Sequence, residues 1–190
     1  MKLPIIAYGD SVLRKKAAEI SEDHPDLDVL IANMFETMYG AHGVGLAAPQ
    51  IGLSIRLFVI DATSFAEDEP ALKDFKKVFI NARIIEETGE KWTFNEGCLS
   101  IPDIREDISR NDTLRISYLD ENWVQHEETF SGLAARVIQH EYDHIEGKLF
   151  TDKLSPLRKA MLKNRLDSIS KGLVKVDYKM KFPSLKKGKR

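Results

Sequence analysis

The run His140-Glu141-Tyr142-Asp143-His144 constrains this chain more than any other feature. Histidines four residues apart lie about one turn apart on one face of an α-helix, so both rings can reach one metal ion. Glu141, between them, is placed beside that ion as a carboxylate that can transfer protons. Apolar spacing, a serine cap and a closing glycine predict the helix: Leu133, Ala134, Val137, Ile138, Ile145, Ser131 and Gly147. Because so short a pattern also arises by chance, the third ligand decides its meaning.

The single cysteine of the chain supplies that third ligand in our interpretation. Cys98 lies in the segment Glu96-Gly97-Cys98-Leu99-Ser100. One thiolate and two imidazoles suit a divalent ion that keeps an open fourth position, which is typical of a catalytic site rather than a structural one. The other histidines have no motif around them: His24, His42 and His126. A single cysteine also excludes an internal disulfide and fits a reducing cytosol.

Apolar periodicity and turn residues predict an α+β fold in a single domain. Helices are expected over residues 26–40 and 155–170, and strands over 55–61, 76–85, 114–119 and 123–130. The acidic stretch 63–75 is expected to be an exposed insertion between strands. This order predicts small antiparallel sheets packed around the helix that carries the histidines.

Charge separates the C-terminus from the rest of the chain. From Lys171 onward there are eight basic residues against the single acid Asp177, although the whole chain carries a net charge of −2. We therefore predict a catalytic domain over 1–170 and a basic, partly flexible extension over 171–190. That extension is either a solvated tail or an electrostatic tether to a polyanion such as RNA. No apolar run approaches a membrane span, and no secretory signal is expected.

A third segment joins two glycines to small apolar residues and ends in an amide: Gly43-Val44-Gly45-Leu46-Ala47-Ala48-Pro49-Gln50. By itself it predicts a tight turn that enters a core strand. With EGCLS at 96–100 and QHEYDH at 139–144, however, it follows the order and rough spacing of the three signature motifs of peptide deformylase. The chain resembles this family from about residue 8 to about residue 152.

The resemblance implies a metal centre and a reaction. The cysteine and histidines of the family motifs hold the metal, here Cys98, His140 and His144, and the motif glutamate, here Glu141, is the general acid and base. The side chain of Gln50 and the backbone N–H of Leu99 donate hydrogen bonds to the developing oxyanion. Family enzymes use Fe²⁺, and also work with Ni²⁺, Co²⁺ or Zn²⁺. They remove the formyl group from the N-terminal methionine of new bacterial-type polypeptides, with metal-activated water as the nucleophile.

Substrate contacts are expected along the same motifs. The backbone of Gly45 would bind an extended peptide, while Gly97 allows a ligand to approach the chain closely. The methionine slot is expected to be lined by Val44, Leu133 and Val137. Val44 stands where isoleucine is common in the family.

Charged groups around the metal have two expected kinds of role. Arg110 is expected to pair with Asp143 or Glu96, and Arg105 to meet the substrate. Asp143 itself would orient His140 or pair with an arginine.

Two other functions remain open at this level. One is a zinc endopeptidase built on the same helix, although no further histidine follows His144 to complete such a site. The other is a ribosome-binding or RNA-binding module with a structural metal. For the deformylase interpretation we expect formylmethionyl peptides as partners, a cytoplasmic location, a monomer, contact with the ribosome through the basic tail, and no DNA or membrane partner.

Overall fold

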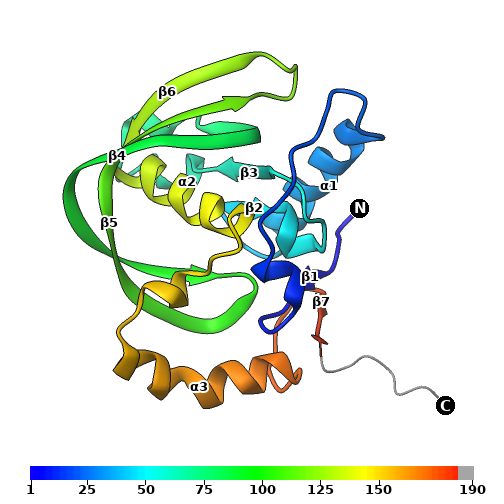
Figure 1. Ribbon diagram of the computed structural model, residues 1–190, viewed down its shortest axis with the longest axis vertical. Helices are drawn as coiled ribbons and strands as arrows, with labels where there is room; N and C mark the ends of the chain where they lie inside the picture. Colours follow the sequence, from blue (N-terminus) through cyan, green and yellow to red (C-terminus); the bar gives the residue numbers. More distant parts are fainter. Residues whose placement is uncertain (184–190) are drawn as a thin grey trace.

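A five-stranded antiparallel sheet curves around one central helix in the computed structural model, which describes residues 1–183 (Figure 1). The strands lie in the order β2-β3-β4-β5-β6: Gly45–Ala47, Leu57–Asp61, Lys76–Cys98, Ile101–Leu119 and Gln125–Ser131. The helices are α1, α2 and α3: Leu27–Gly40, Gly132–Ile145 and Pro156–Ser170. A separate parallel pair joins β1 (Ile5–Ile6) to β7 (Met180–Lys181). The predicted α+β class is confirmed.

Helix α2 forms the centre of the core because nearly its whole circumference is buried. Ala135 and Ile138 are fully buried among aromatic and aliphatic residues of β3, β4 and β5. Such all-round burial is typical of a helix enclosed by other elements rather than one lying on a surface. The motif residues therefore extend from a rigid, enclosed scaffold.

The predicted start of α2 needs a correction, while its predicted end is confirmed. Ser131 occupies the N-cap position, but its side chain makes no capping hydrogen bond. Instead, the N–H of Leu133 donates to the carboxylate of Glu69 at 3.1 Å. A carboxylate suits a helix N-terminus because the unpaired N–H groups there carry partial positive charge. At the other end, Gly147 has a φ of 71° and terminates the helix.

Strands β4 and β5 are much longer than the predicted 76–85 and 114–119. They pair with each other from Ile80↔Leu119 to Cys98↔Ile101, with several register shifts along the way. Most residues from 85 to 93 are exposed, so that stretch lacks the alternation that marks a half-buried strand. This part of β4 is held in strand conformation by hydrogen bonds to β5, and the local sequence pattern does not indicate it. The other predicted elements agree with the structure within two residues at each end.

The prediction that 63–75 is an exposed insertion between strands agrees with its place between β3 and β4 and with the exposure of most of its residues, but it misses apolar contacts with the core. Leu72 is buried, and Phe65 and Phe75 pack against the same core cluster as α2. Two short 3₁₀ helices, Thr63–Phe65 and Pro70–Leu72, hold the segment in place. Its acidic composition hid three apolar anchors spaced too irregularly for either helical or strand periodicity.

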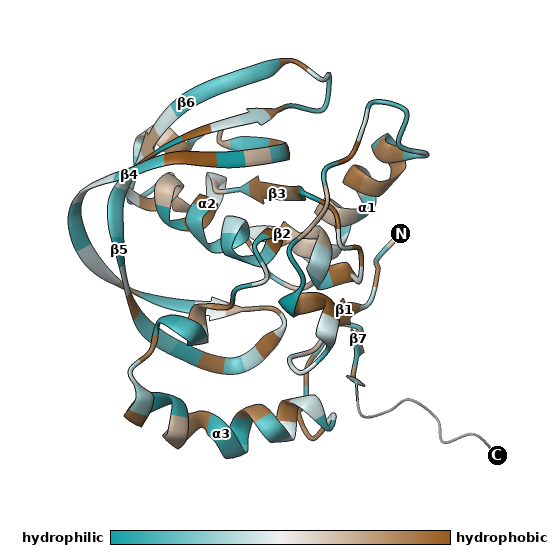
Figure 2. Cartoon of the chain, viewed as in Figure 1, coloured by the Kyte–Doolittle hydropathy of each residue, from teal (hydrophilic) through white to brown (hydrophobic). Residues whose placement is uncertain are grey.

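The remaining elements enclose two smaller apolar clusters. Helix α1 packs on β2 and β3, and α3 covers the start of β5. In Figure 2, β6 is mostly hydrophilic, in keeping with its place as an edge strand of the sheet. Within residues 1–183 no helix combines the length and hydropathy that a membrane crossing requires.

Candidate active site

Three side chains from two elements converge beside α2. His140 and His144 project from one face of the helix, and Cys98 stands at the end of β4. One potential ligand atom from each lies within 4.8 Å of those of the other two, and Cys98 Sγ is 3.4 Å from His144 Nε2. These separations and donor types suit one divalent ion shared by a thiolate and two imidazoles. The structure thus brings together the three predicted ligands.

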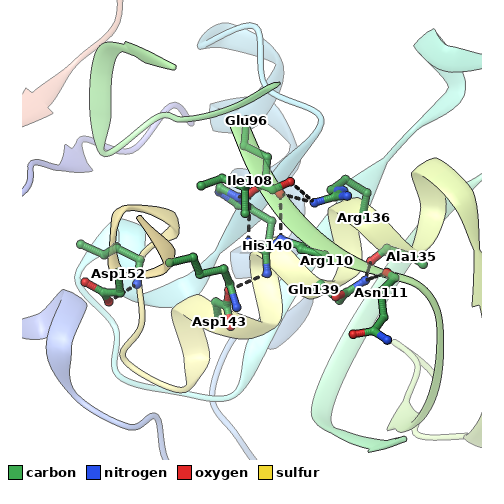
Figure 3. Close-up of polar contacts among 12 residues, drawn as sticks. Glu96, Ile108, Arg110, Asn111, Ala135, Arg136, Gln139, His140, Asp143 and Asp152 are labelled. Carbon is green, nitrogen blue, oxygen red and sulfur yellow. Dashed lines mark hydrogen bonds and ion pairs between the residues drawn. The ribbon is translucent and has the colours of Figure 1, made fainter. Parts of the chain in front are cut away.

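A buried carboxylate fixes the orientation of the first histidine. Nδ1 of His140 donates to Glu96 Oε2 at 2.9 Å, which leaves Nε2 as the free nitrogen (Figure 3). Arg110 donates to both oxygens of Glu96 at 2.7 and 2.9 Å and to Asp143 at 2.7 Å. Burial opposes the charge of Glu96, but hydrogen bonds from His140 and Arg110 outweigh it and hold its pKa below the usual range. Glu96 is therefore a permanent acceptor for the histidine.

A second arginine completes this network, and the sequence analysis missed it. Arg136 Nη1 donates to Glu96 at 2.9 Å and to the carbonyl of Ile108 at 3.0 Å, while Nη2 donates to the carbonyl of Trp92 at 2.7 Å. Its guanidinium lies 4.4 Å from the centre of the Trp92 ring. Arg136 precedes His140 by four residues, so the helical spacing that pairs the histidines also signals this position.

The carboxylate of Glu141 is enclosed by the protein. The side chain is 4% exposed, and its Oε2 has no hydrogen-bond partner within the described part of the chain. Burial raises the pKa of Glu141 to about 7, although the positive charges of His140 and Arg110 act in the opposite direction. A buried carboxyl group left unpaired is costly for stability alone, so its position indicates a chemical use.

Gln50 faces the same centre from the short 3₁₀ helix Ala48–Ile51. Its Oε1 accepts the N–H of Ala47 at 2.9 Å, which fixes the orientation of the amide. Nε2 then lies 3.5 Å from Cys98 Sγ and 3.4 Å from Ser100 Oγ. This donor points at the space beside the three ligands.

A cavity of about 820 Å³ opens onto this centre. The predicted contact residues on its wall are Val44, Gly45, Gly97, Leu99, Arg105 and Val137. Leu133, predicted to line the methionine slot, is not on the wall; its side chain packs against the core cluster around α2. Val137, one helical turn after Leu133, does line the cavity, whereas Leu133 lies too near the start of the helix to reach it.

Further wall residues were not foreseen. Phe65 and Phe94 add apolar surface, and residues 175–178 approach from beyond α3. The latter belong to the stretch predicted as a flexible extension. Part of that stretch therefore borders the active site.

Comparison with known proteins decides the family. The family model described as "Polypeptide deformylase" matches residues 2–160. The chain belongs to this family. It is 61% identical to the peptide deformylase of Christiangramia forsetii and 58% identical to that of Flavobacterium johnsoniae, each comparison covering 100% of both chains.

Solved structures agree with this family. A peptide deformylase from Legionella pneumophila superimposes with a TM-score of 0.80 at 39% identity, covering 91% of this chain and 98% of that one. One from Synechococcus elongatus, in complex with actinonin, gives 0.77 at 37% identity and covers 94% and 92%. The chain is thus a deformylase: a metal-dependent hydrolase that removes N-formyl groups from nascent polypeptides. The endopeptidase and the non-enzymatic module are not supported.

Proposed function

We propose that this deformylase acts on formylmethionyl peptides in the cavity beside α2, with Glu141 as the group that moves the proton. The observation that carries this proposal is the buried carboxylate of Glu141, unpaired at Oε2 among the described residues and adjacent to the Cys98, His140 and His144 set. A formamide is an unreactive amide, so its hydrolysis needs a nucleophile, a stabilised oxyanion and a proton for the departing nitrogen.

Cys98, His140 and His144 would hold the metal. Their donor chemistry fits a borderline divalent ion, and the contact between His140 Nδ1 and Glu96 leaves the other ring nitrogen available. When bound, such an ion supplies Lewis-acid chemistry that makes water nucleophilic at neutral pH. We propose Fe²⁺ as the native ion; Ni²⁺, Co²⁺ and Zn²⁺ share the same preference for nitrogen and sulfur ligands.

The chain's own residues then divide the work. Glu141 accepts the proton of the attacking water and delivers it to the nitrogen that leaves as a free amino terminus. Gln50 Nε2 and the Leu99 N–H donate to the carbonyl oxygen as it gains negative charge, and losing one such donor typically costs about 3 kcal/mol of transition-state stabilisation. Because Gln50 is held by the N–H of Ala47, its donor needs no reorganisation during the reaction.

Substrate binding uses the edge of the sheet and the apolar wall. Strand β2 is the edge strand next to the cavity, so an extended peptide can pair with it through the backbone of Gly45. Val44 and Val137, together with Phe94, supply the apolar surface that a methionine side chain needs. Arg105 is anchored by its Nε to Asn95 Oδ1 at 2.8 Å, so it is held at the cavity wall beside Gly97.

Glu141→Gln tests the proton role. With formyl-Met-Ala-Ser as substrate, kcat should fall by roughly 10³-fold, within the range that general acid–base groups contribute. Metal content, measured on protein purified without oxygen, should equal that of the wild type and consist mainly of iron. Glu121→Gln, an exposed acid in the turn before β6, serves as the control and should keep full activity.

Retained activity in Glu141→Gln would contradict the assignment, whereas zinc as the bound ion would reject only the iron proposal. Wild-type cleavage of unformylated peptides at internal bonds would favour the endopeptidase instead.

We also propose action at the ribosome in the cytoplasm, where formylated chains emerge. The support is the basic composition of the C-terminus, of which residues 184–190 lie outside the described residues. Deletion of 184–190 should weaken ribosome binding at low salt at least tenfold and leave peptide deformylation unchanged. If the wild type and the deletion variant bind ribosomes equally well and salt does not affect the binding, the proposed contact between the basic tail and the ribosome is rejected. The monomeric state stays a prediction.

A further inference from the structure

The segment after α3 borders the cavity, where residues 175–178 form part of its wall. We call residues 174–182 the C-terminal strap. Apolar and charged residues alternate along it: Val174, Val176, Tyr178, Met180 and Phe182 are half-buried, and the lysines and Asp177 between them are exposed. The N–H groups of Ile5 and Ala7 donate to the carbonyls of Lys179 and Lys181 at 2.8 and 2.9 Å. The strap is therefore attached to the domain through β1.

The strap contacts the turn that carries an oxyanion donor. Leu99 and Ser100 form the two-residue connection between β4, which ends at Cys98, and β5. The hydroxyl of Tyr178 donates to the carbonyl of Leu99 at 2.9 Å. On the next residue, the carbonyl of Ser100 accepts the backbone N–H of Tyr8, also at 2.9 Å. Both carbonyls of the turn are thus held by groups distant in sequence.

The turn needs such support because its own residues do not specify its shape. Two-residue hairpin turns favour positive φ angles and residues such as Asn and Gly. Leu99 and Ser100 are neither, and neither has a positive φ. The N–H of Leu99 lies in the peptide unit before its Cα and the carbonyl lies in the unit after it, so the two groups are joined only through that Cα and its φ and ψ angles. Holding the carbonyl therefore acts on the N–H by restricting movement of the Leu99 Cα and rotation about these two angles.

We propose that Tyr178 is a positioning residue that fixes the N–H of Leu99 for the oxyanion. The proposal rests on the function proposed above. Tyr178 lines the cavity, but its hydroxyl is committed to the carbonyl of Leu99 rather than to a substrate. The strap also forms a pair between Asp177 and His42 at 3.2 Å, but both side chains are largely exposed, so this pair contributes little. The hydrogen bond of Tyr178 is the contact that couples the strap to the chemistry.

Tyr178→Phe removes this hydrogen bond and keeps the ring. With formyl-Met-Ala-Ser, kcat should fall about tenfold, less than the 10²–10³-fold loss typical when an oxyanion donor is removed outright. KM should change by less than about twofold, because the substrate side-chain contacts remain, and the melting temperature should stay the same. Tyr39→Phe is the matched control: its hydroxyl donates to Asp61, away from the cavity, and both constants should be unchanged.

A second readout separates this inference from the proposed function. In ¹⁵N-labelled protein, Tyr178→Phe should shift the Leu99 amide resonance and speed its hydrogen exchange, whereas Tyr39→Phe should leave both unchanged. An unchanged kcat, or an unperturbed Leu99 amide, overturns the positioning role. If Tyr178→Phe lowers both kcat and the melting temperature and shifts resonances throughout the protein, the role of Tyr178 is purely structural and the positioning role is overturned. If the wild type releases no formate, the proposed function fails, and the Leu99 amide alone still decides the role of Tyr178.

Discussion

Gly45 lies where Glu141 leaves no room for a side chain. A Cβ at this position would be 2.4 Å from Glu141 Oε1 and 2.8 Å from Glu141 Cγ. Gly45→Ala should therefore displace the carboxylate and lower kcat by about 10²-fold, since small misplacements of catalytic groups carry losses of that order. The measurement is kcat for formyl-Met-Ala-Ser at equal metal content.

Gly40→Ala is the control. Gly40 is the last residue of α1, and a Cβ there would meet only the flexible end of the Lys2 side chain. Wild-type kcat in Gly45→Ala would show that the close approach has no role in holding Glu141.

At the scale of single residues, sequence reasoning succeeded where a motif carried the chemistry. Cys98, His140 and His144 were predicted as ligands, and the structure brings them together. Arg136 was missed although it lies four residues before His140 on the same helix face, because that spacing does not show that Glu96 and the Trp92 carbonyl lie within reach. Leu133 was predicted to line the methionine slot because helical periodicity shows which side chains share one face of the helix. It does not show how far along that face the cavity extends. Such roles depend on distances between different elements, which residue spacing within one element does not reveal.

At the scale of elements, prediction succeeded for helices and failed for long strands. The apolar stripe of residues 26–40 and the motif helix were found because burial imposes the 3.6-residue period. The exposed part of β4 has no such period, since its pairing with β5 rather than burial keeps it extended. Glu69 illustrates a second limit: it binds the start of α2 from 64 residues away, where the predicted local cap, Ser131, does not.

The C-terminal strap was not predicted because its lysines suggested a different structure. The many basic residues of 171–190 indicated a flexible tail, but every second residue from Val174 to Phe182 is apolar or aromatic. That alternation is the pattern of a half-buried strand. The composition of this stretch indicated a solvated tail, whereas its periodicity agrees with the alternating burial of residues 174–182, of which Met180–Lys181 form a strand.

At the scale of the whole molecule, fold stability and chemistry depend on separate groups of charges. The ionised groups of Glu96, Arg110 and Arg136 hold the metal site, where their burial is costly without full pairing. Another group joins three strands of the sheet: Glu128 on β6 accepts hydrogen bonds from Tyr118 on β5 and from Lys77 on β4, the latter at 3.1 Å. This second group can be altered without touching the active site.

The Glu128 group should make part of the stability of the sheet depend on pH. Burial opposes the charge of Glu128, but the hydrogen bonds from Tyr118 and Lys77 outweigh it and lower its pKa. A carboxyl with a lowered pKa in the folded state stabilises fully above its unfolded pKa, about 4.3, and loses this contribution as pH falls through the folded value. Glu128→Gln should therefore lower the urea midpoint at pH 7, and the difference from the wild type should begin to shrink only at a pH below about 4.3. Glu127→Gln, on the exposed face of the same strand, should change neither midpoint, because its pairing with Arg115 is exposed. If Glu128→Gln lowers the urea midpoint by the same amount at pH 7 and at the acidic pH, the shape of the Glu128 side chain, not its charge, holds the three strands together.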